Sequence, residues 1–364
     1  MRSAPFILFF FLIPVLLTRA DGTPRPTPLG PGIPAKSDGI FFFSSPAHPS
    51  RVIVEQSWLG DARIWRYSAG RWSPFQLYKG LGQCFSPLIF DFDGSSNYVL
   101  YVGSWEHSAG IYQIPLSKRL LPFDSLTTIP ESSTCGRILC LRAAPARGDG
   151  RPRLYVASEG PGGGLYEFTK IPGTSAWSFL KIHTGSVGEF AIGDARADGI
   201  TRIYAGDRAP TGLLYEFSWK TNAWLKSILC PALTNILTVA IGDGRGDGIN
   251  RLYVNAANAS WEISFLSNTW HALRIGRPGS RYYIVPARTP AGPRVYSSLQ
   301  ASGPCEWLWR KTGWHEQSLD AITSATGGIA VGDARGDGVP RLYIANGNRR
   351  KTGAVIWEIP LPTH

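Results

Sequence analysis

Hydrophobic and polar residues alternate with a period of two in many short stretches of the chain after residue 38. A typical stretch is Arg-Leu-Tyr-Val at 251–254. It follows a small-residue stretch, Ala-Ile-Gly at 240–242, and precedes an aromatic–acidic–apolar stretch, Trp-Glu-Ile at 261–263. Alternation with a period of two is typical of a β-strand with one buried face. We therefore predict short strands throughout residues 39–364, where no sustained helical periodicity occurs.

The predicted strands belong to a unit that occurs seven times. Three copies are nearly superimposable: AIGDARADGITRIYAG (191–206), AIGDGRGDGINRLYVN (240–255) and AVGDARGDGVPRLYIA (330–345). The aromatic residue of the third strand recurs at intervals of 46 to 54 residues, at Trp65, Tyr112, Tyr166, Tyr215, Trp261, Trp307 and Trp357. A fourth strand usually begins with tryptophan. Such repetition predicts an all-β fold, a seven-bladed β-propeller of mostly four-stranded antiparallel blades.

The seventh unit lacks a fourth strand, because only residues 360–364 follow its third strand. Ring closure requires a strand from another part of the chain. The stretch Gly-Ile-Phe-Phe-Phe at 39–43 fits as that outer strand, and it fits equally well as the first strand of unit one. The sequence leaves both arrangements open.

Residues 1–20 have the features of a secretion signal. Arg2 precedes the apolar run 6–17, and a small-x-small cleavage site ends at Ala20. The apolar run is too short to span a bilayer, so we expect no membrane span and a secreted, extracellular or periplasmic location. Residues 21–38 are rich in proline and glycine and are expected to form an extended linker. The propeller domain is then 39–364.

The chain is basic, with a formal net charge of +11, or +9 once Arg2 and Arg19 are removed with the signal. Such a surface favours anionic partners, for example acidic glycans or cell envelopes, and nucleic acid is the least expected of these in an exported protein. Five cysteines in an exported chain are compatible with a disulfide, and buried free thiols are the alternative. No cysteine pair has the spacing of zinc ligands.

The loop after the first strand reads Gly-Asp-x-Arg-x-Asp-Gly in units four, five and seven, and unit three keeps part of it. This loop resembles that of FG-GAP and VCBS-type repeats, the propeller repeats of integrin α-chain N-terminal regions and many bacterial surface proteins. The resemblance covers the whole predicted domain in architecture. It implies the propeller fold and leaves the function open. In that family the loop often binds Ca²⁺ through carboxylates at its first, third, fifth and ninth positions.

This chain departs from that pattern, because arginine stands at the third and ninth positions. Calcium requires six to eight oxygen ligands, and two cations in place of two carboxylates oppose its binding. We predict metal-free turns held by arginine–carboxylate salt bridges. The residues are Asp194, Arg196, Asp198, Arg202, Asp243, Arg245, Asp247, Arg251, Asp333, Arg335, Asp337 and Arg341.

Unit two is the one candidate for Ca²⁺, since Asp91, Asp93 and Ser95 supply oxygens at positions one, three and five. An ordinary Asp-Gly turn is the alternative there. No other cofactor is expected.

The sequence contains no HxH, HExxH, GxSxG or Walker-type motif. Glutamates at the same strand position in four units are expected to pair with the recurrent arginines rather than to act as acid and base; they are Glu167, Glu216, Glu262 and Glu358. Most tryptophans recur and are assigned to packing, whereas Trp58, Trp105 and Trp309 stand outside the repeated positions. Trp105 and His107 are the candidate ligand contacts, and Asn258 has the form of an N-glycosylation acceptor.

These observations favour a secreted or cell-surface binding module, non-catalytic, with a glycan or protein ligand. Two alternatives stay open. One is an extracellular polysaccharide lyase or hydrolase whose active site lies in a unit that breaks the repeat. The other is a structural interaction module without a small ligand. The sequence does not indicate the oligomeric state.

Overall fold

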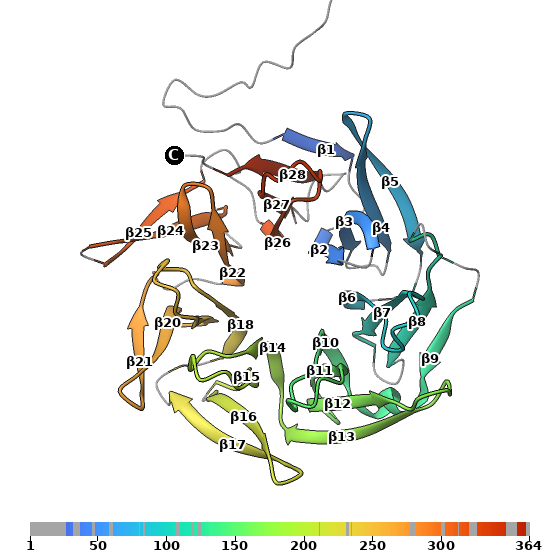
Figure 1. Ribbon diagram of the computed structural model, residues 1–364, viewed down its shortest axis with the longest axis horizontal. Helices are drawn as coiled ribbons and strands as arrows, with labels where there is room; N and C mark the ends of the chain where they lie inside the picture. Colours follow the sequence, from blue (N-terminus) through green and yellow to red (C-terminus); the bar gives the residue numbers. More distant parts are fainter. Residues whose placement is uncertain are drawn as a thin grey trace, which may run out of the picture.

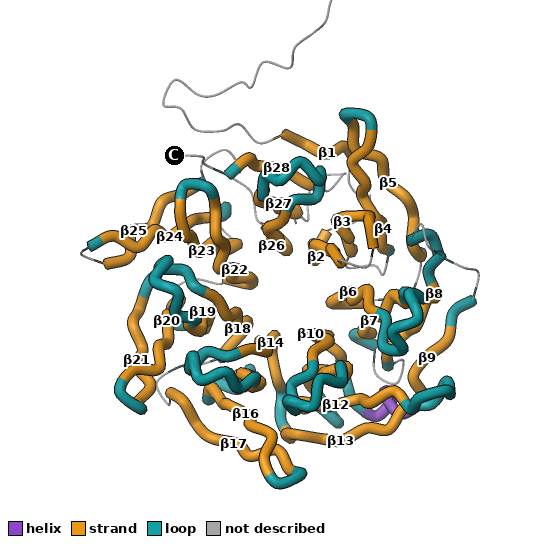
Figure 2. The backbone as a smooth tube through the Cα atoms, in the orientation of Figure 1, coloured by secondary structure: helices purple, strands orange, loops and turns teal. Residues whose placement is uncertain are grey.

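The chain folds into a ring of seven four-stranded antiparallel sheets (Figure 1). The structure, a computed structural model, describes residues 27–31, 37–45, 48–57, 61–79, 81–82, 84–106, 110–117, 120–122, 125–210, 212–230, 233, 235–276, 281–299, 303–311, 313–319, 326–346 and 355–361. Within this part of the chain the one helical element is the 3-10 helix Pro130–Thr134, coloured purple in Figure 2. No described helix is long and apolar enough to cross a bilayer. The predicted seven-bladed β-propeller is confirmed, and the predicted signal peptide lies outside the described residues.

In six of the blades the four strands follow one another in sequence from the axis outwards. Blade 1 consists of β2 (Ser37–Ser45), β3 (His48–Ser57), β4 (Ala62–Ser68) and β5 (Arg71–Tyr78). Blade 2 consists of β6 (Cys84–Phe90), β7 (Val99–Ser104), β8 (Ile111–Pro115) and β9 (Thr127–Ile129). Blade 3 consists of β10 (Arg137–Ala144), β11 (Arg153–Glu159), β12 (Gly164–Lys170) and β13 (Trp177–Thr184). Blade 4 consists of β14 (Val187–Gly193), β15 (Arg202–Asp207), β16 (Leu214–Lys220) and β17 (Ala223–Cys230). Blade 5 consists of β18 (Ile236–Gly242), β19 (Arg251–Ala256), β20 (Ala259–Leu266) and β21 (Thr269–Arg274). Blade 6 consists of β22 (Arg281–Thr289), β23 (Gly292–Leu299), β24 (Cys305–Arg310) and β25 (Gly313–Ser318).

Blade 7 joins the two ends of the chain. Its inner strands are β26 (Thr326–Gly332), β27 (Arg341–Asn346) and β28 (Val355–Pro360), and its outer strand is β1 (Thr27–Pro31). β1 runs antiparallel to β28, with Thr27 opposite Glu358 (Figure 1). Residues 39–43 lie in β2, the inner strand of blade 1, which decides between the two arrangements that the sequence left open.

The prediction of a linker over residues 21–38 is therefore wrong for part of its length, because it contains β1 and the start of β2. An outermost strand pairs on one side only, so it tolerates the prolines and glycine that made this segment look unstructured. Leu29 of β1 is buried in a cluster with Ala345 and Ile356 of blade 7.

The hydrophobic core lies between the blades. Among the described residues, seven clusters of buried side chains each span the boundary between two neighbouring blades. The tyrosines of the second strands are at most 2% exposed and anchor these clusters: Tyr101, Tyr155, Tyr204, Tyr253, Tyr296 and Tyr343. Burying one large side chain contributes about 1.5–3 kcal/mol, so repeated packing between sheets stabilises the ring.

In five blades the tryptophan of the fourth strand packs against the preceding blade. This agrees with the assignment of the recurrent tryptophans to packing. Each ring meets the second-strand tyrosine of the preceding blade edge to face, with centroids 6.0–6.1 Å apart. The pairs are Trp72–Tyr343, Trp177–Tyr101, Trp224–Tyr155, Trp270–Tyr204 and Trp314–Tyr253.

Small residues in the inner strands allow the blades to converge on the axis. A Cβ atom at Gly193 would lie 2.9 Å from Cδ1 of Ile241 in the next blade, and one at Gly242 would lie 2.8 Å from Cγ of Pro286. Both contacts are too short for carbon atoms, so glycine is required at these inner positions.

The ring has two faces that carry different loops. The loops between first and second strands open on one face, named here the 1–2 face, and it carries the Gly-Asp-x-Arg-x-Asp-Gly motifs. The loops between second and third strands open on the opposite face, the 2–3 face. Because consecutive strands of a blade are antiparallel, every blade distributes its loops in the same way.

Candidate functional site

Asp–Arg pairs hold the loops of the 1–2 face. In blade 4, Asp194 accepts hydrogen bonds from the backbone N–H groups of Asp198 (3.2 Å) and Gly199 (2.6 Å). Arg202 donates two hydrogen bonds to Asp198, both of 2.7 Å, and this lowers the pKa of Asp198 to about 2. Blades 5 and 7 repeat this geometry with Asp243, Asp247, Arg251, Asp333, Asp337 and Arg341, and blade 3 has the pair Asp149–Arg153.

The arginine at the third loop position pairs outside the loop, with the glutamate of the third strand. Arg196 donates from Nε and Nη2 to Glu216 on β16, with both distances 2.7 Å. Its guanidinium also lies over the ring of Phe265 in blade 5, 4.4 Å from the centroid. The same three-residue arrangement occurs in blades 3, 5 and 7 as Arg147–Glu167–Trp219, Arg245–Glu262–Trp309 and Arg335–Glu358–Tyr67.

Trp309 therefore occupies a repeated position at the end of the third strand, and the prediction that it stands outside the repeat is wrong. The sequence did not show this because the position varies among tryptophan, phenylalanine and tyrosine. Trp58, the other unassigned tryptophan besides Trp105, lies outside the described residues.

The third-strand glutamates are the acceptors of these clusters. Glu262 is fully buried and accepts hydrogen bonds from Arg245 (2.9 Å from Nε) and from Nε1 of Trp314 in blade 6 (3.2 Å). The Tyr253 hydroxyl lies 3.5 Å from the same carboxylate. A carboxylate enclosed in this way has a structural role, because no reacting group can approach it.

The Asp91 loop of blade 2 has the geometry of an Asp-Gly turn. Asp91 accepts hydrogen bonds from the backbone N–H groups of Asp93 (3.1 Å) and Ser96 (2.6 Å), so both of its oxygens are used inside the turn. Nζ of Lys170 lies 3.9 Å from the carboxylate of Asp93, and Ser95 is exposed. Two engaged oxygens and a nearby ammonium group do not fit a calcium site. The described residues hold no cluster of three histidine, cysteine, aspartate or glutamate side chains suited to a metal ion.

Two further predicted site residues, Trp105 and Asn258, lie on the 2–3 face. Trp105 follows the end of β7 and is half-buried, with the guanidinium of Arg137 5.2 Å from its ring centroid. His107 lies outside the described residues, so its position relative to Trp105 is not described. Asn258 lies in the tight turn between β19 and β20, where its Oδ1 accepts a hydrogen bond from Trp261 Nε1 (3.4 Å).

Three cysteines of the described structure are free thiols, namely Cys135, Cys140 and Cys230. Cys305 is buried. Burial raises the pKa of Cys135 to about 12 and that of Cys140 to about 11. The side chain of Cys84 lies outside the described part of the structure.

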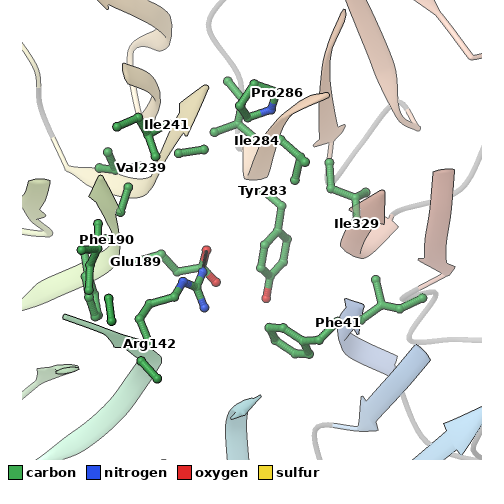
Figure 3. Close-up of a pocket in the computed structure, with 17 residues that line it drawn as sticks. Phe41, Arg142, Glu189, Phe190, Val239, Ile241, Tyr283, Ile284, Pro286 and Ile329 are labelled. Carbon is green, nitrogen blue, oxygen red and sulfur yellow. Dashed lines mark ion pairs between the residues drawn. The ribbon is translucent and has the colours of Figure 1, made fainter. Parts of the chain in front are cut away.

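A cavity of about 360 Å³ lies at the centre of the ring (Figure 3). Its walls come from the first strands of six blades, namely β2, β10, β14, β18, β22 and β26, and consist mainly of alanine, isoleucine, valine, phenylalanine and proline side chains. Arg142, Glu189 and Tyr283 are the three lining residues whose side chains carry a polar group. Figure 3 shows that they reach into the cavity from three different blades.

Arg142 and Glu189 are the charged residues that line this cavity. Nη2 of Arg142 lies 3.8 Å from Oε2 of Glu189, and Nη1 of Arg142 donates to the backbone oxygen of Leu141 (3.1 Å). Burial raises the pKa of Glu189 to about 7, although Arg142 and Arg208 both act to lower it. Glu189 is therefore only partly ionised at neutral pH.

Sequence reasoning missed these three residues, although Arg142 left a signal. The strand register places Arg142 opposite Tyr155 in blade 3. The equivalent positions opposite the second-strand tyrosines of blades 4, 5 and 7 are Ala191, Ala240 and Ala330. An arginine in place of alanine at the axis breaks the repeat where space is most restricted.

Two further polar clusters lie on the 2–3 face, between blades 3 and 4. Nη1 of Arg208 lies 2.6 Å from Oε2 of Glu159. His183 Nε2 lies 3.2 Å from one oxygen of Asp207, and the Tyr215 hydroxyl donates to the other (3.0 Å). Together with Trp105 and Arg137, these clusters make the 2–3 face of blades 2 to 4 chemically unlike the repeated loops of the 1–2 face.

The fold and this geometry define a seven-bladed β-propeller with non-repeated polar and aromatic side chains on the 2–3 face of blades 2 to 4. By sequence the chain matches no known protein family and no curated protein. In fold it is similar to an Agrocybe aegerita lectin that recognises non-reducing terminal N-acetylglucosamine, with a TM-score of 0.54, 12% identity, and coverage of 84% of this chain and 92% of that one. It is also similar to a chain of the mitotic checkpoint complex, with a TM-score of 0.61, 10% identity, and coverage of 99% and 100%. At these identities the likeness shows the fold alone.

Proposed function

We propose that this protein is a secreted or cell-surface binding module that holds a glycan or protein ligand without transforming it. The observation that carries the proposal is the gathering of non-repeated charged and aromatic side chains on the 2–3 face of blades 2 to 4. A propeller built only for its own stability has no need of such an asymmetry. A propeller that binds a ligand at the mouth of its channel requires it.

The comparisons and the charge support the same function. One propeller of similar fold is a lectin, and another belongs to a protein complex, so this scaffold accommodates both kinds of ligand. The net charge of +11 favours anionic ligands over neutral ones. Within this proposal the units are of the FG-GAP and VCBS type, with arginine in place of the family's calcium.

The enzyme alternative would rest on His183 and Asp207, which have the geometry of a base and its orienting acid. Both oxygens of Asp207 are engaged, by His183 and by Tyr215. The imidazole packs against the rings of Tyr215 and Phe217, with centroids 4.9 and 5.7 Å away. A histidine held this tightly between two blades is suited to joining them rather than to abstracting a proton from a substrate.

The test is a glycan array and a pull-down from extracellular extracts, each performed with the secreted protein and with two variants. Trp105→Ala and Arg137→Ala alter the 2–3 face of blades 2 and 3. Leu273→Ala, on an exposed position of outer strand β21, is the matched control. We expect one ligand class to bind the wild type and Leu273→Ala and to bind both face variants at least tenfold more weakly. Turnover of a polysaccharide would favour the enzyme alternative, and no ligand in either assay would favour the structural module.

A further inference from the structure

We propose that the central cavity is a second binding site, which takes a small ligand through a carboxylate group held by Arg142, with Tyr283 and Glu189 beside it. This site lies inside the ring and is independent of the ligand proposed for the 2–3 face. Its basis is that three polar side chains, from blades 3, 4 and 6, reach into a cavity whose other lining side chains are apolar (Figure 3).

The guanidinium of Arg142 has donors to offer a ligand. Among the described residues it donates one hydrogen bond, to the backbone oxygen of Leu141. Its distance of 3.8 Å to Glu189 is an ion-pair contact that is too long for a hydrogen bond. The side chain of Arg142 is 37% exposed although it lies at the centre of the ring. An arginine presents five N–H groups in a planar fork that matches a carboxylate.

The local charge selects an anion. Arg142 stays protonated at every relevant pH, whereas Glu189 is only partly ionised near pH 7 because burial raises its pKa to about 7. The lining of the cavity is therefore positive on average, and charges interact strongly where water is scarce. Arg208 is already paired with Glu159. One available guanidinium suits a singly charged carboxylate better than a phosphate ester, which would require a second cation.

The size and walls of the cavity limit the body of the ligand. A volume of about 360 Å³ admits a compact molecule, and Phe41, Ile284 and Ile329 offer it apolar contacts. Two sources of such a carboxylate fit: a free organic acid with an apolar body, or the terminal uronic acid of a glycan. Because the side chains of the walls offer few hydrogen-bond partners for sugar hydroxyls, we expect the organic acid to bind more tightly.

Binding depends on pH through Glu189. The titratable and charged groups that face it are Arg142 and Cys140 on β10, Arg208 after β15, and Tyr283 on β22. Burial places the pKa of Glu189 itself at about 7. A bound carboxylate repels the ionised form of Glu189 and accepts a hydrogen bond from its protonated form. The affinity for a carboxylate ligand should therefore rise as the pH falls through 7. If Glu189 must be protonated for binding, the rise is about tenfold between pH 8 and pH 6.

The experiment is calorimetric titration of the whole secreted protein with benzoate, glucuronate and benzamide, the last being an uncharged isostere of benzoate. We expect benzoate to bind at one site, glucuronate more weakly and benzamide not measurably. Tighter binding of glucuronate than of benzoate would identify the glycan terminus as the source. Equal binding of benzoate and benzamide, or binding of neither acid, would overturn the proposal. If no glycan or protein binds the 2–3 face but benzoate binds the cavity, the proposed function fails and the cavity site stands.

The variants assign the residues. Arg142→Ala introduces the alanine that blades 4, 5 and 7 carry at this position, and it should reduce benzoate affinity at least tenfold. Arg142→Lys keeps the charge, loses the planar fork and should bind at an intermediate strength. Arg71→Ala, on exposed outer strand β5, is the control and should bind as the wild type does. Glu189→Gln should bind benzoate with no pH dependence between 6 and 8. Undiminished binding by Arg142→Ala would refute the assignment.

Discussion

The guanidinium of Arg245 lies 3.5 Å from the centroid of the Trp309 ring in the next blade, while its Nε donates to Glu262 in its own blade (2.9 Å). One side chain thus connects a buried carboxylate of blade 5 with an aromatic ring of blade 6. The same connection recurs from blade 3 to blade 4, where Arg147 lies 3.6 Å from the Trp219 centroid. A cation–π contact contributes about 0.5–2 kcal/mol, so the polar clusters join the blades in addition to the apolar core.

Loss of one of these carboxylates should destabilise the ring strongly. Glu262→Ala leaves Arg245 and Arg251 without their buried counter-charge, and removing one partner of a buried pair costs about 3–5 kcal/mol. Urea unfolding monitored by tryptophan fluorescence measures the change. The control is Asp93→Ala, an exposed carboxylate, which should cost less than about 1 kcal/mol.

A compensating double variant tests the cause. Arg245→Met combined with Glu262→Leu removes both charges, and it should recover part of the stability that Glu262→Ala loses. If the double variant is less stable than the single one, unpaired charge is not the reason for the loss.

The loop aspartates should make the protein sensitive to strong acid. Pairing with arginine lowers the pKa of Asp149, Asp198 and Asp247 from 3.8 to about 2. A lowered pKa in the folded state gives stability that is complete above the ordinary value of 3.8 and is lost as the pH falls through 2. We expect a melting temperature that changes little through these groups between pH 7 and 5 and then falls between pH 4 and 2.

The triple variant with asparagine at 149, 198 and 247 is the matched comparison for this acid transition. It should melt below the wild type at pH 7 and lose less on acidification, because it no longer carries these titrating groups. Parallel melting curves for the two proteins from pH 5 to 2 would contradict this explanation.

Removal of metal should leave the stability unchanged. The ninth loop position holds an arginine, such as Arg202, that supplies the positive charge a calcium ion would bring, and Asp91 uses both oxygens within its own turn. We expect melting temperatures in EDTA and in millimolar Ca²⁺ to agree within about 1 °C, as measured by differential scanning calorimetry. A large loss in EDTA would show that the arginines do not replace the ion.

The strand β1 should be required for a closed ring. A chain that begins at residue 32 leaves β28 with an unpaired edge and removes the buried Leu29, so it should melt at a lower temperature and aggregate faster. A chain that begins at residue 27 retains the strand and is the control. Identical melting and light scattering for the two chains would show that β1 contributes nothing to closure.

The sequence predicted the blade count and the strand order because the repeat places the same residue types at the same strand positions. Tyr253 and Trp261 mark their strands in blade 5 just as Tyr204 and Tyr215 do in blade 4. The arginine–glutamate clusters were foreseeable in part, since the charges recur together. The same repetition did not reveal which of the two loop arginines would donate hydrogen bonds to Glu216, because strand register decides that Arg196 does so.

The repeat could not predict features that occur in one unit and have no equivalent in the others. The strand β1 occurs once, and its Pro28 and Gly30 resemble those of a linker. Glu189 and Tyr283 line the same central cavity although 94 positions separate them in sequence, because the ring brings their blades round one axis. Arg142 was the exception, detectable as a charged residue at a position that holds alanine in blades 4, 5 and 7.

The pairing of β1 with β28 has a consequence for biosynthesis. Among the strands of the ring, β1 is synthesised first and β28 last, so the ring stays open until all the other strands have been made. A chain that lacks β28 therefore cannot form the closed ring. The unpaired edges and exposed apolar faces of such an open chain would make it a substrate for chaperones and proteases.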